Sequence, residues 1–154
     1  ISNVIPNLKY IIVGSGDDAE RIKELIRKHH LEGKVILTGF ITDEEIVAYY
    51  NLCDVFVMPS KGEGFGIVFL EALACGKPVI AGNKSGSVDA VLKGDVGILV
   101  DPDNLTQIKE AIVNVLSGNC DPRLLDKEYL RNRVCSEFGF DKYKERLGTI
   151  LRGI

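Results

Sequence analysis

Residues 59–82 read PSKGEGFGIVFLEALACGKPVIAG. The apolar run at 55–58 predicts a buried parallel strand, and Pro59 ends it because proline has no N–H group for the sheet. The glycines that follow allow a turn with positive φ or with backbone pressed against a ligand. Residues 67–75 predict a helix that Gly76 caps. The segment therefore predicts a strand end, a glycine-rich turn, a short helix and a second strand.

The turn predicts an anion site. A glycine-rich turn that leads into a helix leaves several backbone N–H groups without partners, and the helix dipole adds about half a positive charge there. Two carboxylates accompany this site, Glu63 in the turn and Glu71 in an otherwise apolar helix. A carboxylate in such a helix is costly unless it has a partner. Vicinal hydroxyls of a sugar or a ribose are suitable partners, because each donates to one carboxylate oxygen.

A simpler interpretation of the two glutamates is open. Glu63 would then be an exposed loop residue, and Glu71 a residue at the helix edge that pairs with a lysine such as Lys77. The run Glu-Gly-Phe-Gly at 63–66 and the strand–turn–helix–strand setting favour the functional interpretation.

Two glutamates separated by seven residues, with Gly-Phe-Gly after the first, resemble the signature of retaining glycosyltransferases of the GT-B architecture, in particular family 4 (group 1). The resemblance implies that Glu63 is the catalytic residue and faces the transferred sugar. It also implies that Glu71 binds the ribose hydroxyls. The residues implied to hold the donor sugar and its diphosphate through backbone amides are Gly64, Phe65, Gly66 and Ile67.

Composition limits the class of protein. The chain has 154 residues, of which 45% are hydrophobic, so it can bury a core and predicts one domain across residues 1–154. A net charge of −3 without a basic stripe argues against nucleic acid as the main partner. The four cysteines lie far apart without a C-x-x-C pair, which favours reduced, buried thiols over a disulfide and predicts no zinc site.

We expect a cytoplasmic protein. No apolar stretch approaches the roughly 20 residues needed to cross a bilayer, and no signal peptide is visible. Peripheral contact with the inner face of a membrane stays open, because it would use sequence outside this chain.

A second glycine-rich turn follows the strand predicted at 8–13. Its sequence, Gly-Ser-Gly-Asp-Asp-Ala at 14–19, fits the dinucleotide pattern G-x-G-x-x-A and offers NAD binding as an alternative. Two aspartates stand where a pyrophosphate would lie, and the next strand, 34–38, is not followed by the acid that would hold a ribose. The glycosyltransferase resemblance instead implies that Gly14 and Gly16 line the donor cleft.

The next helix opens with a capping box, Thr42 to Glu45, and runs to Leu52. The resemblance implies that the residues before it contact the nucleotide base through backbone groups; these are Gly39, Phe40 and Ile41. The only histidines, His29 and His30, end the preceding helix, where they suit the helix dipole.

The second half predicts a strand at 96–100, a helix that starts at 101–103, and two further helices at 124–138 and 141–151. The loop at 82–89 departs from the family pattern Gly-Gly-x-x-Glu, because it carries Ser87 and Asp89, which leaves its donor contacts open. The segment Phe-Gly-Phe-Asp at 138–141 is similar to the one from which the last helix of the family folds back across the domain junction.

The predicted fold is α/β, a Rossmann-like doubly wound parallel sheet. The family resemblance implies a further strand and helix before Ile1, which carry the Arg and Lys that neutralise the donor diphosphate, and a separate N-terminal domain that binds the acceptor. In the common 3-2-1-4-5-6 order that further strand is central, so a sheet without it would expose two edges.

The predicted function is that of the donor-binding domain of a retaining glycosyltransferase. It would move a hexose-type sugar from a UDP- or GDP-sugar to a hydroxyl of a glycan or lipid, as in polysaccharide biosynthesis, without a metal or other cofactor. The isolated domain would be inactive. The alternatives are a nucleotide-binding module without transfer activity, a non-catalytic scaffold, and a GT-B sugar-nucleotide epimerase, for which cleft histidines would be expected.

Overall fold

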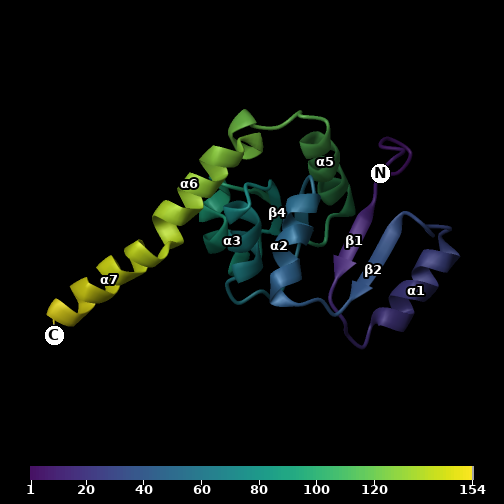
Figure 1. Ribbon diagram of the computed structural model, residues 1–154. Helices are drawn as coiled ribbons and strands as arrows, with labels where there is room; N and C mark the ends of the chain where they lie inside the picture. The colour runs from purple at the N-terminus through teal and green to yellow at the C-terminus, as the bar shows by residue number, and fades with distance from the viewer. Residues whose placement is uncertain (154) are drawn as a thin grey trace. The chain divides into compact units, whose positions relative to one another are not determined.

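The computed structural model describes residues 1–153 (Figure 1). Strands and helices alternate along the chain and every strand pairing is parallel, which confirms the predicted α/β class. The chain divides into two compact units, residues 1–48 and residues 49 onward. The single domain predicted across residues 1–154 stays a prediction.

The first unit is a two-stranded parallel sheet with one helix. Strand β1 (Tyr10–Val13) pairs with β2 (Val35–Gly39), and α1 (Ala19–Lys28) connects them. Ile22 and Ile26 of α1 are half-buried, whereas Leu25 between them is exposed. None of the side chains in residues 1–48 is fully buried, because so small a unit has little interior.

The second unit contains a three-stranded parallel sheet in the order β3 (Phe56–Met58), β4 (Val79–Gly82), β5 (Ile98–Val100). Strand β4 is central, and all four of its residues are buried. The helices of this part of the chain are α2 (Asp43–Leu52), which begins in the first unit, α3 (Ile67–Ala74), α4 (Ser87–Ala90), η1 (Leu92–Gly94), α5 (Leu105–Leu116), η2 (Pro122–Leu125), α6 (Lys127–Phe138) and α7 (Phe140–Arg152).

Helices cover both faces of the three-stranded sheet. Ile80 of β4 packs with Val100, Ala111 and Val115 in a cluster that joins the sheet to α5. Val79 and Ala81 point to the opposite face by strand alternation, and there α3 contacts β4 and α6 contacts α3. The fully buried side chains of α3 and α6 include Phe69, Leu73 and Leu130. This two-sided cover is the doubly wound arrangement that the sequence predicted.

The strands of residues 1–153 form two sheets. In this part of the chain β1 pairs only with β2, and β3 pairs only with β4. The family resemblance implies a further central strand. Its existence stays a prediction.

Local signals placed most helix ends correctly. The capping box is formed, since the Thr42 N–H donates to Glu45 Oε2 at 2.9 Å and the Glu45 N–H donates to Thr42 Oγ1 at 3.3 Å. Gly76 has φ 69° and the Lys77 N–H donates to the Ala72 carbonyl at 3.0 Å, as expected of a helix end capped by glycine.

Two predicted helix starts were wrong by several residues. The helix expected from 101–103 begins at Leu105, because the Asn104 side chain accepts the Gln107 N–H and caps it there. The helix expected from Leu124 is divided, because Asp126 has extended backbone and its carboxylate caps α6.

Two loops that follow neighbouring strands pack closely through glycine. The Gly86 N–H donates to the Glu63 carbonyl at 3.0 Å. A Cβ atom at Gly86 would lie 1.9 Å from the Gly64 carbonyl oxygen, and one at Gly82 would lie 2.2 Å from the Ser60 carbonyl oxygen. Because these neighbours are backbone atoms, they cannot move aside cheaply, and the glycines fix how the loop after β4 supports the turn after β3.

The last helix, α7, extends from the end of α6 (Figure 1). It buries none of its side chains, and Phe140, Ile150 and Leu151 are exposed. Within residues 1–153 no helix is both long enough and apolar enough to span a membrane.

We expect Gly86→Ala to lower the free energy of unfolding by about 1–3 kcal/mol, because overpacking against backbone forces the two loops apart. Gly62→Ala is the matched control, since its Cβ would have no neighbour within 4 Å, and it should change stability by less than about 0.5 kcal/mol. Urea unfolding midpoints of the two variants measure the difference. Equal midpoints would show that the close packing of the loops does not hold in solution.

Candidate functional site

The turn into α3 depends on Gly66. Its φ of 89° lies in the left-handed region, and a Cβ there would lie 2.4 Å from the Phe69 ring and 3.0 Å from Glu63 Cγ. Glycine is therefore required for conformation and for space. Within residues 1–153 the N–H groups of residues 64–67 donate to no acceptor. They stand at the positive end of the α3 dipole, as the predicted anion site requires.

A hollow of about 420 Å³ lies beside this turn. It is lined by Met58, Glu63, Phe65, Gly66, Ile67 and Val68. The predicted residues Glu63, Phe65, Gly66 and Ile67 are thus brought together at the carboxyl end of β3 and the start of α3. Gly64 lies in the same turn between two of them.

Glu63 is half-buried at the edge of the hollow. Its backbone carbonyl is held by Gly86, and its side chain passes close to Gly66. Within residues 1–153 its carboxylate has no hydrogen bond and no ion pair. The backbone is thus fixed while the carboxylate keeps its capacity to accept hydrogen bonds.

Glu71 is exposed, which corrects the premise that its surroundings are apolar. It follows Ile67 by four residues, so the two lie on the same face of α3, and Ile67 is 66% exposed. The Tyr50 hydroxyl donates to Glu71 Oε2 at 2.7 Å. The alternative pairing with Lys77 is wrong, since the Lys77 ammonium is buried and donates to the Asn51 carbonyl at 2.8 Å.

Two aromatic residues near the site were missed by sequence reasoning. Tyr50 lies near the end of α2, and its hydroxyl donates to Glu71 Oε2. Phe138, at the end of α6, packs edge-on against Phe65 with 5.6 Å between ring centroids. No local signal identifies either contact, because each joins segments that are distant in the sequence.

The remaining predicted residues lie in the first unit. The Gly14 N–H donates to the Gly39 carbonyl at 3.0 Å, so these two glycines meet at the carboxyl ends of β1 and β2. Both have positive φ, and an added Cβ at Gly14, Gly16 or Gly39 would meet nothing within 4 Å. Phe40 is 81% exposed and Ile41 is half-buried. The glycines therefore present open backbone, as a ligand-binding edge requires.

The first unit does not favour NAD binding. Asp18 occupies the N-cap position of α1 without capping it, and its carboxylate instead pairs with Arg21 at 2.8 Å. An acidic side chain thus stands at the helix start where a pyrophosphate would bind. His29 and His30 follow the other end of α1, away from the Gly14 turn, which argues against an epimerase that would use them.

An ion-pair cluster joins the loops after β3, β4 and β5. Lys84 pairs with Asp101 at 2.7 Å and with Asp103 at 3.0 Å, and Lys61 also pairs with Asp103. The hydrogen bond from Lys84 lowers the pKa of Asp101, and the hydrogen bonds from Lys61 and Lys84 lower the pKa of Asp103. The cluster is exposed, so it contributes to loop arrangement more than to overall stability.

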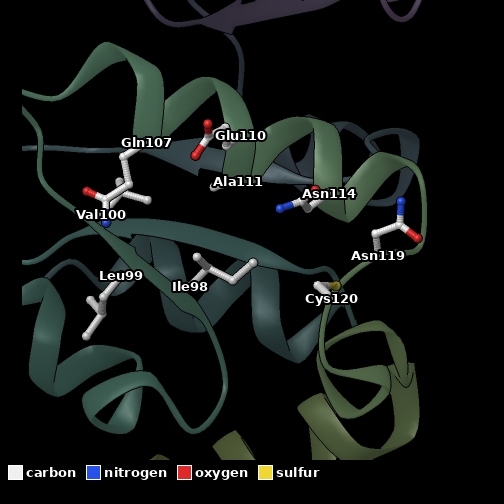
Figure 2. Close-up of a pocket in the computed structure, with 9 residues that line it drawn as sticks. All are labelled: Ile98, Leu99, Val100, Gln107, Glu110, Ala111, Asn114, Asn119 and Cys120. Carbon is white, nitrogen blue, oxygen red and sulfur yellow. The ribbon is translucent and has the colours of Figure 1, made fainter.

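A second hollow, of about 340 Å³, lies between β5 and α5 (Figure 2). Polar groups of Gln107, Glu110, Asn114 and Asn119 border it, and Ile98 and Ala111 contribute its apolar part. It has no lining residue in common with the hollow beside Glu63. It therefore offers an internal comparison for binding experiments.

Residues 1–153 contain no group of three or more His, Cys, Asp or Glu arranged to hold a metal ion. All four cysteines are free thiols, as expected, but the prediction that they are buried is wrong, since three are half-buried and Cys135 is exposed. The prediction that the protein uses no metal or other cofactor stays untested.

The parallel α/β fold and the turn at Gly66 place the chain among the GT-B glycosyltransferases. Residues 2–132 match the family model of glycosyl transferases group 1, and the chain belongs to this family. A relative, the GDP-mannose-dependent alpha-(1-6)-phosphatidylinositol monomannoside mannosyltransferase of Mycobacterium tuberculosis, is 33% identical over 93% of the chain.

Two solved structures illustrate the similarity. HepE of Anabaena, in complex with UDP, superposes with a TM-score of 0.81 at 25% identity and covers 99% of this chain and 44% of its own. The C-terminal domain of the group 1 glycosyl transferase LpcC of Francisella tularensis gives a TM-score of 0.75 at 26% identity and covers 90% and 74%. The chain spans 39% of the length of the mycobacterial mannosyltransferase.

We expect Lys84→Met to lower the urea midpoint slightly at neutral pH, and this difference to disappear in acid. Asp101 and Asp103 have lowered folded pKa values, so their contribution is present above the unfolded value of about 3.9 and is lost as pH falls through the folded values. Lys109→Met is the control, because Lys109 has no ion pair within residues 1–153. Midpoints measured between pH 7 and pH 2 test this, and a difference that persists at pH 2 would exclude the carboxylates as its source.

Proposed function

We propose that this chain is the donor-binding domain of a retaining glycosyltransferase. In the whole protein it would bind a UDP- or GDP-sugar and present a hexose-type sugar to an acceptor hydroxyl of a glycan or lipid. The observation that carries the proposal is the turn at residues 63–67, where unpaired N–H groups at a helix start lie between two carboxylates, Glu63 and Glu71. An anion and a polyhydroxyl group are the chemistries that such a site accepts.

The diphosphate would bind at the start of α3. Amide groups of residues 64–67 and the helix dipole would take the negative charge that develops on the leaving diphosphate. Glu71 lies one turn further along the exposed face of α3, where its carboxylate would accept hydrogen bonds from the ribose hydroxyls. Ile67, on the same face, would provide apolar contact.

Glu63 would orient the transferred sugar. Its carboxylate lines the hollow without an internal partner, so that ring hydroxyls of the sugar can donate to it. This role is electrostatic and positional and requires no covalent bond to Glu63. Retention of configuration is proposed from the family resemblance.

We propose, from the family resemblance, that the first unit by itself contacts the donor through backbone groups. Gly14 and Gly16 would approach the donor sugar and diphosphate, and Gly39, Phe40 and Ile41 would contact the base. The open space around the three glycines supports this assignment. We propose that Arg and Lys side chains elsewhere in the whole protein neutralise the diphosphate, and that a separate domain binds the acceptor.

Two relatives support a nucleotide-sugar donor. The mycobacterial relative is named as GDP-mannose-dependent, and the Anabaena protein was crystallised with UDP. They differ in the base, so the donor base of this protein is left open between UDP and GDP. Without an acceptor domain, we propose that this domain alone binds a donor and transfers nothing.

We expect Glu71→Ala to weaken binding of one nucleoside diphosphate by about 1–3 kcal/mol, through loss of charge-assisted hydrogen bonds to the ribose. Calorimetric titration of the full-length protein with UDP, GDP, ADP and NAD measures the affinity for each and identifies the base of the donor nucleotide. Glu110→Ala is the control, since Glu110 is also an exposed helical glutamate but lines the second hollow (Figure 2).

Each result of this titration has a definite consequence. Weakening by Glu110→Ala alone would move the nucleotide to the hollow beside β5. Binding of NAD alone would favour the dinucleotide alternative at the Gly14 turn. Failure of every diphosphate to bind would favour a non-catalytic role.

We expect Glu63→Gln to retain nucleoside diphosphate affinity within about threefold and to lower the transfer rate by about 10²-fold or more, as removal of a positioned charge in an active site does. The change is nearly isosteric, and the Glu63 backbone is held by Gly86, so the turn should persist. Release of nucleoside diphosphate from the donor sugar, with and without acceptor, measures the rate. Full activity of Glu63→Gln would remove Glu63 from the reaction.

A further inference from the structure

We propose that Tyr50 is a positioning residue, which fixes the Glu71 carboxylate so that one of its oxygens is presented to the ribose of the donor. The inference rests on the proposed function of Glu71. The carrying observation is the 2.7 Å hydrogen bond from the Tyr50 hydroxyl to Glu71 Oε2, which joins the end of α2 to the exposed face of α3.

Tyr50 is itself rigidly held. It is only 6% exposed, and its ring packs edge-on against Phe56 with 5.8 Å between centroids. Phe56 packs in turn edge-on against Phe69 of α3 at 5.7 Å. Three aromatic rings from α2, β3 and α3 therefore set the position of the hydroxyl relative to the helix that carries Glu71. A donor held in this way directs the carboxylate without depending on solvent.

Glu71 needs such a constraint because it is exposed. A free glutamate side chain on a helix surface samples several rotamers, and ordering it on binding costs affinity. The hydrogen bond from Tyr50 orders the side chain in advance. It occupies Oε2, and since an ionised carboxylate accepts through both oxygens, Oε1 keeps its capacity for a ribose hydroxyl.

The Tyr50 hydroxyl is protonated near neutral pH and can donate its hydrogen bond there. Burial raises its pKa well above the usual value for tyrosine, and the hydrogen bond to Glu71 raises the pKa further. A tyrosinate beside Glu71 would repel it, and the direction of the shift excludes that state near neutrality.

Tyr50→Phe tests the proposal, because it removes the hydroxyl and leaves the aromatic packing. The natural-length protein is titrated with the diphosphate it binds, UDP or GDP, and with the 2′,3′-dideoxy form of the same nucleotide. We expect Tyr50→Phe to weaken the ribonucleotide about two- to tenfold, the cost of ordering one side chain, and to leave the dideoxy nucleotide unchanged. The ratio between the two affinities is therefore the diagnostic quantity.

Tyr129→Phe is the matched control. It also removes a tyrosine hydroxyl bonded to a carboxylate, Asp95 Oδ1 at 2.9 Å, but at the start of α6. It should leave the ratio unchanged. A cycle with Glu71→Ala adds a second test, since loss of the Tyr50 hydroxyl should have no further effect on the ratio once Glu71 is absent.

The outcomes separate this inference from the proposed function. A wild-type protein that binds no nucleoside diphosphate overturns both. The positioning role alone is overturned if the wild-type protein prefers the ribonucleotide to the dideoxy nucleotide and a folded Tyr50→Phe variant keeps the same preference. Equal weakening of both nucleotides by Tyr50→Phe shows a purely structural role and also overturns it. Thermal unfolding shows whether Tyr50→Phe is folded. If it is not, Tyr50→Trp replaces it, because tryptophan keeps an aromatic ring and moves the hydrogen-bond donor. An unchanged preference of Tyr50→Trp for the ribonucleotide would then overturn the positioning role of Tyr50.

Discussion

The left-handed backbone at Gly66 is the constraint on which the candidate site depends. It allows the chain to leave β3, turn, and start α3 with its first N–H groups unpaired. The space around it is closed by the Phe69 ring and the Glu63 side chain, so no larger residue fits. The same turn places Glu63 before the helix and Glu71 on its exposed face. The candidate anion site and the position of Glu63 beside it thus depend on one backbone conformation.

The loops that support this turn are held by different means. Backbone contacts at Gly82 and Gly86 leave no room for a side chain, which fixes the loop after β4 against the turn. The ion pairs of Lys84 with Asp101 and Asp103 are exposed and add a weaker connection to the loop after β5. The close backbone contacts therefore lie next to Glu63, and the exposed ion pairs lie further from it.

The two units of the chain differ in how they are stabilised. The second contains every buried side chain in the part of the chain that the structure describes. The first has a parallel strand pair and one helix, and its contribution to the proposed site is backbone at Gly14 and Gly39. The second unit is therefore well packed by itself, whereas the first unit has little interior of its own.

The sequence by itself determined the parallel α/β class, the strand–turn–helix–strand segment, the capping box at Thr42 and the family, because periodicity, glycine and capping residues act over a few neighbouring positions. The start of α5 was misplaced, because any of several polar residues before Leu105 can cap a helix. Only the tertiary structure decided that Glu71 is exposed and bonded to Tyr50, that Lys77 is buried instead of paired with it, and that Phe138 packs on Phe65. Residues 50 and 71 are 21 positions apart in the sequence, and residues 65 and 138 are 73 positions apart. No local pattern specifies which side chains meet across such separations.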